Sequence, residues 1–501
     1  MRAPLLLLLA GALALRLVFF GGLLGWDDVE YAEAARRLLG GEPAPRSMFE
    51  MRYGVTLPLA AVQALFGAGE HAAALVPLAY SALEIVLGGA LGALLGGPAV
   101  GLVAAALLGV LPLAVVAATD VHADLPASVF MALAMYAVLR ADAGGRRRAA
   151  WLAGAGLALG LAYVTKEVAL VLALVLAARI LLLRRRAAGY AWLLAGFLAV
   201  VALDMAGSLW RAGDPLVRHA PAFARLHVEH MRTAPPGYGW MLAYPAMLLA
   251  PWSGSFGYFA GVFYLALAGA AWGLRAGERA VGELVVWWLP VLLVFNLAPL
   301  DGTLTRPLFV HFARTLHPLL IPLAVTAAFA LVRGLGGRPA AQAAVAAGVL
   351  ALAAAGIVRT HADHRAWAAV ARQAAEVIRR EPADTLVVAD RLSVARLRVL
   401  LPERRAQITW WRDGGLARAG RAPLLVLSDP RLLRRDVEAG APAAMLAPPA
   451  AWEPVAELFP PPRASLRGLL RRRLGAGREA PAARPPAPAV LWRVRPAAAG
   501  R

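Results

Sequence analysis

Long apolar runs dominate the first 358 residues of the chain. They cover residues 5–24, 71–95, 99–118, 124–140, 189–208, 256–274, 281–298, 308–332 and 340–358. Each run is close to the roughly 20 residues that a helix needs to cross a hydrocarbon layer about 30 Å thick. Uninterrupted runs of this length exclude a soluble protein with a large core. The pattern therefore predicts a polytopic α-helical membrane protein.

The stretch 149–183 is too long to be a single span. As one straight helix, its 35 residues would extend for about 50 Å. Three arginines precede it at 146–148 and three follow it at 184–186, and positively charged loops stay on the cytoplasmic side. The stretch is therefore predicted to be a hairpin of two short helices, with Tyr163–Glu167 as its outer tip.

With this hairpin the chain is expected to cross a bacterial inner (plasma) membrane about 11 times. The N-terminus is then cytoplasmic, and every short arginine-rich loop lies on the cytoplasmic side. No small-residue cleavage pattern stands just before Trp26, so the run at 5–24 is expected to be a retained helix. Residues 25–70 form an outer loop, in which 28–39 has the spacing of an interfacial helix.

Residues 359–501 differ in character from the rest of the chain. The strand-like runs Leu386–Ala389 and Leu424–Leu427 stand between amphipathic helical stretches. This alternation predicts a small α/β domain outside the membrane, on the outer (periplasmic) side. No glycine-rich phosphate-binding motif follows either strand, so the sequence assigns this domain no chemistry.

The charge of the chain agrees with a membrane protein. In a soluble protein a net charge of +20 would indicate a nucleic-acid partner. Here the arginines cluster in short loops between apolar runs, which indicates topology signals and contact with anionic membrane lipids, with no nucleic-acid partner. The absence of cysteine excludes disulfides and thiolate metal sites.

Lys166 is the only lysine, although the chain carries 51 lysines and arginines in total. One interpretation is that this position needs a compact ammonium group and not a planar guanidinium. The other is that one lysine persisted by chance.

Charged groups at membrane depth are costly, so they are candidates for function. Apart from Arg16 and Glu84, most of them fall at the predicted outer ends of the helices. The candidates are Asp27, Asp28, Tyr31, Arg52, Tyr53, His122, Asp124, Lys166, Glu167, Arg314 and His317. Because they come from several loops on one face, they are expected to build one site at the outer interface.

This set of residues suits the transfer of a sugar from a polyprenyl phosphate. A phosphate leaves without a general acid when cations neutralise its charge, and Lys166 and the arginines could do so. The acceptor hydroxyl needs a base, for which Asp27 or Asp28 is the candidate. Alternatively, the two carboxylates could hold a divalent metal.

Structural explanations compete at several of these positions. The Asp27–Asp28 pair could be a polar cap, and Arg16 could snorkel or pair with Glu84. Asp124 could be the N-cap of a helix that has proline early in its first turn. Arg314 and His317 could be ordinary interface residues.

At these residues the chain resembles the GT-C membrane glycosyltransferases. It is most similar to glycosyltransferase family 39, the protein mannosyltransferase and aminoarabinose transferase-like group. The resemblance rests on the order and spacing of five passages. These are Trp26–Glu33, Arg52–Leu59, Thr119–Pro126, Gly160–Glu167 and Arg314–Pro318. The last passage departs from the family pattern, because Thr315 stands where tyrosine is common.

The resemblance covers roughly residues 1–358 and implies a GT-C-like transmembrane domain whose outer loop carries the catalytic motif. It implies an inverting hexosyl or pentosyl transferase that depends on a lipid carrier. Asp27 would be the base or a metal-linked carboxylate. Lys166, with Arg52 or Arg314, would face the lipid phosphate.

The sequence therefore predicts an integral-membrane glycosyltransferase. It would move a sugar from a polyprenyl-phosphate donor to an acceptor hydroxyl at the outer membrane face. The acceptor, whether lipid, glycan or protein, and the sugar stay open. The alternatives are a transporter or flippase for lipid-linked sugars and a non-catalytic assembly subunit. Transporters often contain internal repeats, and none is visible here.

Overall fold

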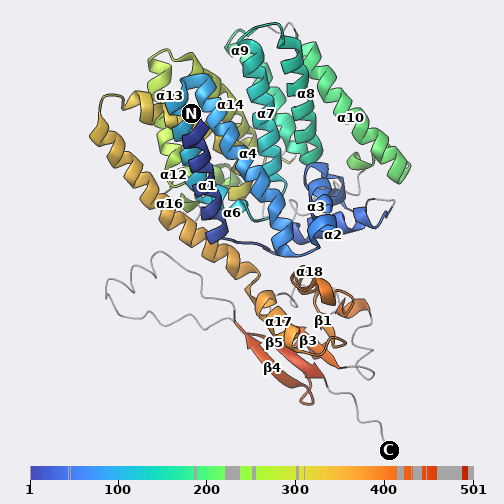
Figure 1. Ribbon diagram of the computed structural model, residues 1–501. Coiled ribbons are helices and arrows are strands. Elements are labelled where there is room, and N and C mark those ends of the chain that lie inside the picture. Colours follow the sequence, from blue (N-terminus) through green and yellow to red (C-terminus); the bar gives the residue numbers. More distant parts are fainter. Residues whose placement is uncertain are drawn as a thin grey trace, which may run out of the picture.

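The computed structural model of the protein describes most of the chain. The described residues are 2–42, 45, 47–185, 189–220, 237–250, 256–300, 304–309, 311–413, 423–429, 432, 443–446, 448–459 and 488–494. They form a helical bundle and, below it in Figure 1, a smaller domain built around a β-sheet. The fold class expected from the sequence is confirmed.

The bundle begins with ten helices. They are α1 (Arg2–Val18), α2 (Asp27–Leu39), α3 (Tyr53–Phe66), α4 (Glu70–Gly96), α5 (Pro98–Val110), α6 (Pro112–Ala117), α7 (Asp124–Asp142), α8 (Arg148–Thr165), α9 (Val171–Leu182) and α10 (Tyr190–Ala212). The later helices are α12 (Ala243–Leu249), α13 (Val262–Arg275), α14 (Arg279–Leu297), α15 (Leu320–Phe329) and α16 (Pro339–Trp367). Short 3₁₀ segments are η1 (Met48–Met51), η2 (Glu167–Leu170), η3 (Val217–His219), η4 (Gly239–Leu242), η5 (Phe256–Tyr258) and η6 (Ala313–Leu319), and η7 (Ala330–Gly334) is a π-helical turn.

Seven helices in the described part of the chain are long and apolar enough to cross a membrane. They are Glu70–Gly96, Asp124–Asp142, Arg148–Thr165, Tyr190–Ala212, Arg279–Leu297, Ala313–Gly334 and Pro339–Ala366. The other expected spans correspond to the shorter apolar helices α1, α5 with α6, α9 and α13. Length and composition alone therefore identify fewer spans than the 11 crossings expected.

The predicted hairpin at 149–183 is confirmed. Helix α8 ends at Thr165, Lys166 has extended backbone angles, and α9 begins at Val171 after the turn η2. The start of α3 packs against this tip so closely that a Cβ atom on Gly54 would lie 1.8 Å from the Thr165 Oγ1 atom. The tip of the hairpin is therefore fixed against the outer loop.

Small residues let the membrane helices approach one another. A Cβ atom on Gly156 of α8 would lie 1.9 Å from the Leu193 carbonyl oxygen of α10, and one on Gly196 would lie 2.2 Å from the Ala153 carbonyl oxygen. Apolar side chains gain little from association in lipid, so such close backbone packing is what holds helices together there.

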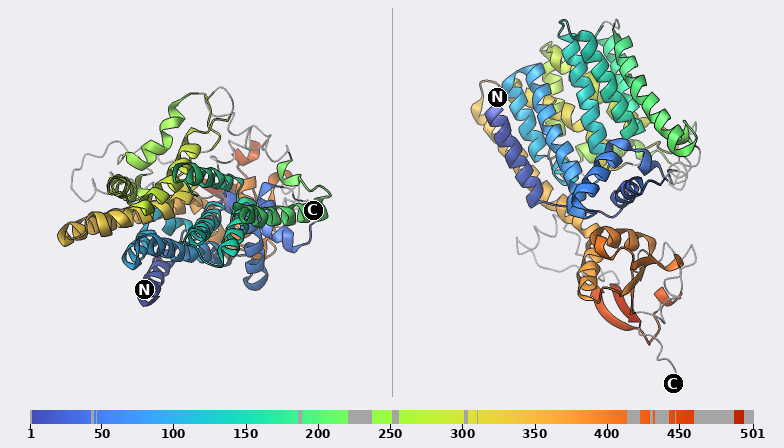
Figure 2. Two further views of the ribbon diagram at one scale, coloured as in Figure 1. Left: turned by 90° about the horizontal axis from the view of Figure 1, so that it is seen from above. Right: turned by 45° about the vertical axis from the view of Figure 1, so that its right-hand side comes forward.

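Helix α16 connects the bundle to the C-terminal domain (Figure 2). It continues to Trp367, so the expected boundary at residue 358 falls within a helix. The domain contains α17 (Ala369–Arg380), α18 (Arg391–Leu400), η8 (Pro402–Arg404), η9 (Trp411–Asp413) and α20 (Ala443–Leu446). Its strands are β1 (Leu386–Ala389), β2 (Ile408–Trp410), β3 (Leu424–Ser428), β4 (Glu453–Leu458) and β5 (Ala489–Val494).

These strands form one sheet in the order β2-β1-β3-β5-β4. Strands β1, β2 and β3 are parallel, whereas β5 runs antiparallel to both β3 and β4. Both strands predicted from the sequence, β1 and β3, lie in the centre, where every residue except Leu386 is buried. Fully buried parallel strands read as continuous apolar runs, which explains why these two were visible in the sequence.

The C-terminal domain packs directly on the segment of the bundle around α2. Its apolar core, built from α17, α18 and the sheet, also contains Leu23 and Val29 from the segment around α2. Arg372 of α17 pairs with Glu70 at 2.6 Å and also donates to the Gly21 and Leu23 carbonyl oxygens. The domain therefore holds the segment that carries Asp27 through apolar contacts and hydrogen bonds.

Candidate active site

Helix α2, which carries Asp27, lies at the end of the bundle that faces the C-terminal domain (Figures 1 and 2). Most of the candidate residues stand where a helix begins or ends. Asp27 opens α2, Arg52 precedes α3, Asp124 opens α7, Lys166 follows α8, and Arg314 lies in η6. Because α7 begins here, the arginines at 146–148 that follow it lie at the opposite end of the bundle.

Asp27 and Arg314 form the ion pair at the centre of the site. The Arg314 Nη2 atom donates to the Asp27 Oδ2 atom at 2.6 Å, and both side chains are partly exposed. The two residues are 287 positions apart in the chain. Asp27 is thus an accessible carboxylate that is held in place by a cation.

Asp28 is in a different environment from its neighbour. It is buried, and its carboxylate accepts N–H groups from Leu24 at 2.6 Å, Gly25 at 2.9 Å and Trp26 at 2.6 Å. Burial raises the pKa of Asp28, although these backbone N–H groups oppose that shift. Gly25 has a φ of +82°, which a residue with a side chain adopts at a cost. Asp28 therefore shapes the loop before α2, which favours a structural role for it.

Lys166, at the hairpin tip, forms an ion pair with Asp124 at the start of α7. The Lys166 side chain is 21% exposed, whereas the Asp124 side chain is 6% exposed. The Asp124 backbone N–H donates to the His122 Nδ1 atom at 3.2 Å. Helix α7 begins at Asp124 without a side-chain cap, so the possible N-cap role is not observed.

Arg52, Tyr31 and Glu167 form a second group beside Lys166. Arg52 donates to the Tyr31 hydroxyl at 2.8 Å and lies 3.9 Å from Glu167. Tyr31 is fully buried, which raises the pKa of its phenol, so the hydroxyl stays protonated. Glu167 also pairs with Arg218 at 3.2 Å, and the Arg218 guanidinium lies 5.8 Å from the centre of the Tyr53 ring. Arg218 thereby joins Tyr53 and the hairpin tip.

His317 extends the site toward the membrane interior. Its ring lies 5.9 Å from that of His122, and its Nε2 atom is 3.0 Å from the Glu84 Oε1 atom, although without hydrogen-bond geometry. Arg16 donates instead to Ser81 at 2.7 Å and to three backbone carbonyl oxygens. Arg16 thus stabilises the helix packing and makes no direct contact with Glu84.

The two candidate carboxylates are each engaged by other partners. Within the part of the chain that the structure describes, no group of three or more histidine, aspartate or glutamate side chains could hold a metal ion. Asp27 is bound to Arg314, and Asp28 is bound to backbone N–H groups. Their oxygens therefore do not converge on one point.

Comparisons with known proteins bear on the fold. A family model described as dolichyl-phosphate-mannose-protein mannosyltransferase matches residues 55–210. The structure of ArnT from Cupriavidus metallidurans in the apo state has a TM-score of 0.64 and 16% identity, over 99% of this chain and 98% of that chain. The chain therefore has the fold of ArnT. The resemblance expected from the sequence is confirmed.

Two further structures are similar to this fold. ArnT bound to undecaprenyl phosphate has a TM-score of 0.62 and 16% identity, over 97% of both chains. The Archaeoglobus fulgidus oligosaccharyltransferase in complex with Zn and sulfate has a TM-score of 0.51 and 15% identity, over 87% of this chain and 69% of that chain. No curated protein sequence matches this chain. The family match contains Asp124 and Lys166, whereas Asp27 and Arg314 lie outside it.

Two residues of the candidate site were not predicted from the sequence. Asp120 is buried near Asp27, Asp28 and Arg314, and burial, followed by the charge of Asp28, raises its pKa well above the ordinary value. Asp120 belongs to the passage 119–126, which the sequence indicated, but its burial beside other carboxylates could not be predicted from the sequence. His364 interacts electrostatically with His122 and Arg314. It comes from α16, beyond the last predicted span, and no local pattern indicated it.

The pH dependence of folding should report on His122. Burial, as the largest influence, lowers the pKa of this histidine, so the folded protein binds its proton less readily than the unfolded chain. The stabilisation is therefore present above the ordinary histidine pKa of about 6.5 and is lost as the pH falls below it, by about 1 kcal/mol per pH unit. The drop in melting temperature between pH 7.5 and pH 5.5 should be smaller in His122→Gln. Equal drops in both proteins would contradict this assignment.

Proposed function

We propose that the protein transfers a sugar from a polyprenyl-phosphate donor to an acceptor hydroxyl at the outer face of a bacterial inner membrane. One observation carries the proposal: an accessible carboxylate, Asp27, stands among cations at the ends of membrane helices. The undecaprenyl phosphate bound to ArnT, which has the same fold, supports a lipid-linked donor.

In the proposed reaction, Asp27 accepts the proton of the acceptor hydroxyl as its oxygen attacks the anomeric carbon. The bond between that carbon and the phosphate oxygen breaks, and the electron pair leaves with the polyprenyl phosphate. A single displacement of this kind inverts the configuration at the anomeric carbon. Arg314 has five N–H donors, so it can contact the leaving phosphate while it still holds Asp27.

Lys166 and Arg52 complete the proposed phosphate site. Lys166 has three N–H donors, and its pair with Asp124 leaves donors available for a phosphate. Arg52 lies next to Glu167 at the hairpin tip. Cations fixed in advance lower the barrier because they need little reorganisation when charge develops on the leaving group. Tyr31, Tyr53, His122, Glu167 and His317 are proposed to surround the substrates.

The membrane orientation and the domain division are parts of the same proposal. The arginine-rich loop 146–148 lies at the end opposite the site, and positive loops remain cytoplasmic. This supports a cytoplasmic N-terminus, an outer-face active site and a periplasmic C-terminal domain. The division into residues 1–358 and 359–501 then separates the membrane domain, which includes the outer loop 25–70, from the periplasmic domain.

The test uses purified protein in nanodiscs with a small panel of polyprenyl-phosphate sugars and a crude envelope extract as acceptor. Release of polyprenyl phosphate from one donor is the expected result. Passage of an intact donor across proteoliposomes, without release, would instead indicate a flippase. Neither release nor passage with any donor would favour a non-catalytic subunit.

Arg396 offers a separate test of how Asp27 is positioned. Its side chain is buried in the C-terminal domain, donates to the Gly25 carbonyl oxygen at 3.1 Å and lies over the Trp26 ring. Arg396→Met should lower kcat about ten- to hundred-fold with little change in the donor KM. A misplaced catalytic group slows the chemical step more than it weakens substrate binding. Arg396→Lys should restore part of kcat.

The matched control for Arg396 is Arg391→Met on the same helix, since the Arg391 side chain is 74% exposed. The control should retain the parent kcat. Equal kcat values in Arg396→Met and the parent would mean that the C-terminal domain does not position Asp27. If Arg396→Met lowered only the amount of folded protein and left its kcat unchanged, the conclusion would also be that the C-terminal domain does not position Asp27.

A further inference from the structure

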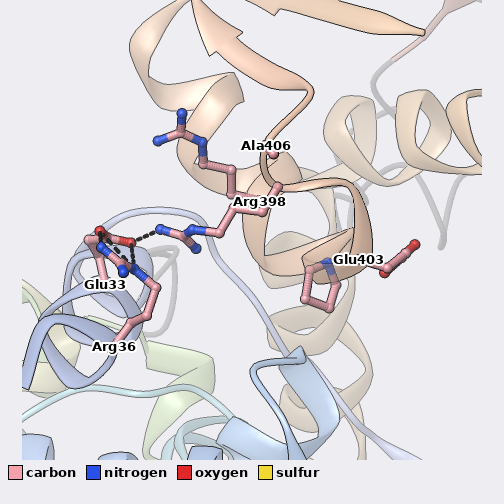
Figure 3. A pocket seen from close by; sticks show the side chains of 7 residues that line it. Glu33, Arg36, Arg398, Glu403 and Ala406 are labelled. Carbon is pink, nitrogen blue, oxygen red and sulfur yellow. Dashed lines mark hydrogen bonds and ion pairs between the residues drawn. The ribbon is translucent and has the colours of Figure 1, made fainter. Parts of the chain in front are cut away.

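A cavity of about 490 Å³ lies where α2 meets the C-terminal domain. It is lined by Glu33, Arg36, Arg398, Pro402, Glu403, Arg405 and Ala406 (Figure 3). None of these residues belongs to the proposed active site. Glu33 and Arg36 lie on α2 beyond Asp27, and the other lining residues belong to α18 and the segment that follows it.

Positive charge exceeds negative charge in this cavity. Arg36 pairs with Glu33 at 2.8 Å, and Arg405 of the C-terminal domain also contacts Glu33. Glu33 is therefore shared by guanidinium groups from both domains, and Arg36 also lies 3.7 Å from Glu42, which is outside the cavity lining. The second acidic residue, Glu403, points away from this cluster in Figure 3.

The third arginine is held in place without being neutralised. The Arg398 Nε and Nη2 atoms both donate to the Ile408 carbonyl oxygen, at 3.1 Å and 2.9 Å. Among the described residues, Arg398 makes no ion pair. Burial and then the neighbouring charge of Arg405 lower the pKa of Arg398, as expected where guanidinium groups crowd together.

We propose that this cavity binds the phosphate group of a phosphate ester. A phosphate monoester offers three acceptor oxygens and a charge of about −1.5 to −2. This suits a cavity with three arginines, of which Arg36 and Arg405 share Glu33 and Arg398 makes no ion pair among the described residues. The planar guanidinium binds such oxygens through two parallel hydrogen bonds. The ester could belong to a lipid headgroup or to a soluble phosphorylated molecule, because the recognised group is the same. Binding at this site does not depend on sugar transfer.

The test measures binding of inorganic phosphate to the full-length protein in phosphatidylcholine nanodiscs by calorimetry, with no sugar donor present. Arg398→Gln and Arg36→Gln change two separate elements and should each weaken binding about tenfold, because each removes a charge-assisted contact. Arg391→Gln removes the same charge from an exposed position on α18 and should leave the affinity unchanged. Size-exclusion profiles and circular dichroism would establish that all four proteins are folded.

Equal affinities in the parent and in both cavity variants would overturn the proposal, since any phosphate would then bind elsewhere, including at Lys166 and Arg314. Undetectable binding by the parent would overturn it too. A second arm replaces half of the phosphatidylcholine with phosphatidic acid, whose headgroup is a phosphate monoester. Weaker phosphate binding in the parent, but not in Arg398→Gln, would support the site and identify a lipid headgroup as its ligand. An unchanged Arg398-dependent affinity would support the site and identify a soluble phosphate ester.

Discussion

Replacing Asp27 with asparagine is expected to lower the rate of sugar transfer about 10²- to 10⁴-fold, the range that a positioned general base supplies. The amide can still accept the hydrogen bond from Arg314, so the loop should keep its structure. It cannot take the proton of the acceptor hydroxyl. The measurement is the rate of polyprenyl phosphate release in nanodiscs at saturating donor and acceptor.

Two variants of the same helix make the Asp27 result specific. Glu30→Gln is the control, because Glu30 is a partly exposed carboxylate of α2 whose ion pair is with Arg391, at 3.7 Å. This variant should retain activity. Asp28→Asn should mainly lower the melting temperature, because the Asp28 carboxylate holds three backbone N–H groups. If Asp28→Asn abolished transfer in a fully folded protein while Asp27→Asn did not, the two aspartates would have the opposite roles.

Replacing Lys166 with methionine is expected to lower transfer about 10²- to 10³-fold, the loss typical of one preorganised group that stabilises developing charge. The same change leaves Asp124 buried without its cation, which costs about 3–5 kcal/mol of stability. Activity and folding would therefore both decline in the single variant. The two effects must be separated before the lysine is assigned to phosphate binding.

The double variant Lys166→Met with Asp124→Asn separates them. Removing both charges should restore most of the melting temperature, since no buried charge is left unpaired. It should not restore transfer, because the phosphate would still lack its cation. Recovery of transfer together with stability would show that Lys166 only balances Asp124 and does not act on the donor.

The hairpin and the two central strands could be predicted from local pattern, because each depends on residues close together in the chain. Because arginine-rich loops flank residues 149–183 and such loops lie on the same side of the membrane, the chain had to cross the membrane and return within this stretch. The apolar runs at β1 and β3 indicated buried parallel strands. Strand β4 has mostly exposed or half-buried residues, so its composition gave no such signal.

The candidate site could be predicted as a set of residues but not as a set of contacts. Asp27 and Asp28 are neighbours in sequence, and only the structure shows that one faces Arg314 while the other is tied to backbone N–H groups. The contact of Asp27 with Arg314 joins residues 287 positions apart. His364 reaches the site from α16, a helix whose role depends on packing that no short motif encodes.

The docking of the C-terminal domain was also beyond sequence reasoning. Leu23 and Val29 look like parts of an outer loop, yet they complete the core of a domain that begins more than 300 residues later. An apolar side chain in a loop does not reveal which surface it covers. The contact matters because the same loop carries Asp27.

The most direct test of the central claim is a stoichiometry measured in one reaction. Purified protein in nanodiscs receives a polyprenyl-phosphate donor with a labelled sugar and a defined acceptor, and mass spectrometry counts polyprenyl phosphate and glycosylated acceptor over time. We predict that one polyprenyl phosphate appears for each acceptor modified, and that Asp27→Asn stops both together. Donor that stays intact, or glycosylated acceptor that forms equally fast with Asp27→Asn, would contradict the proposed site.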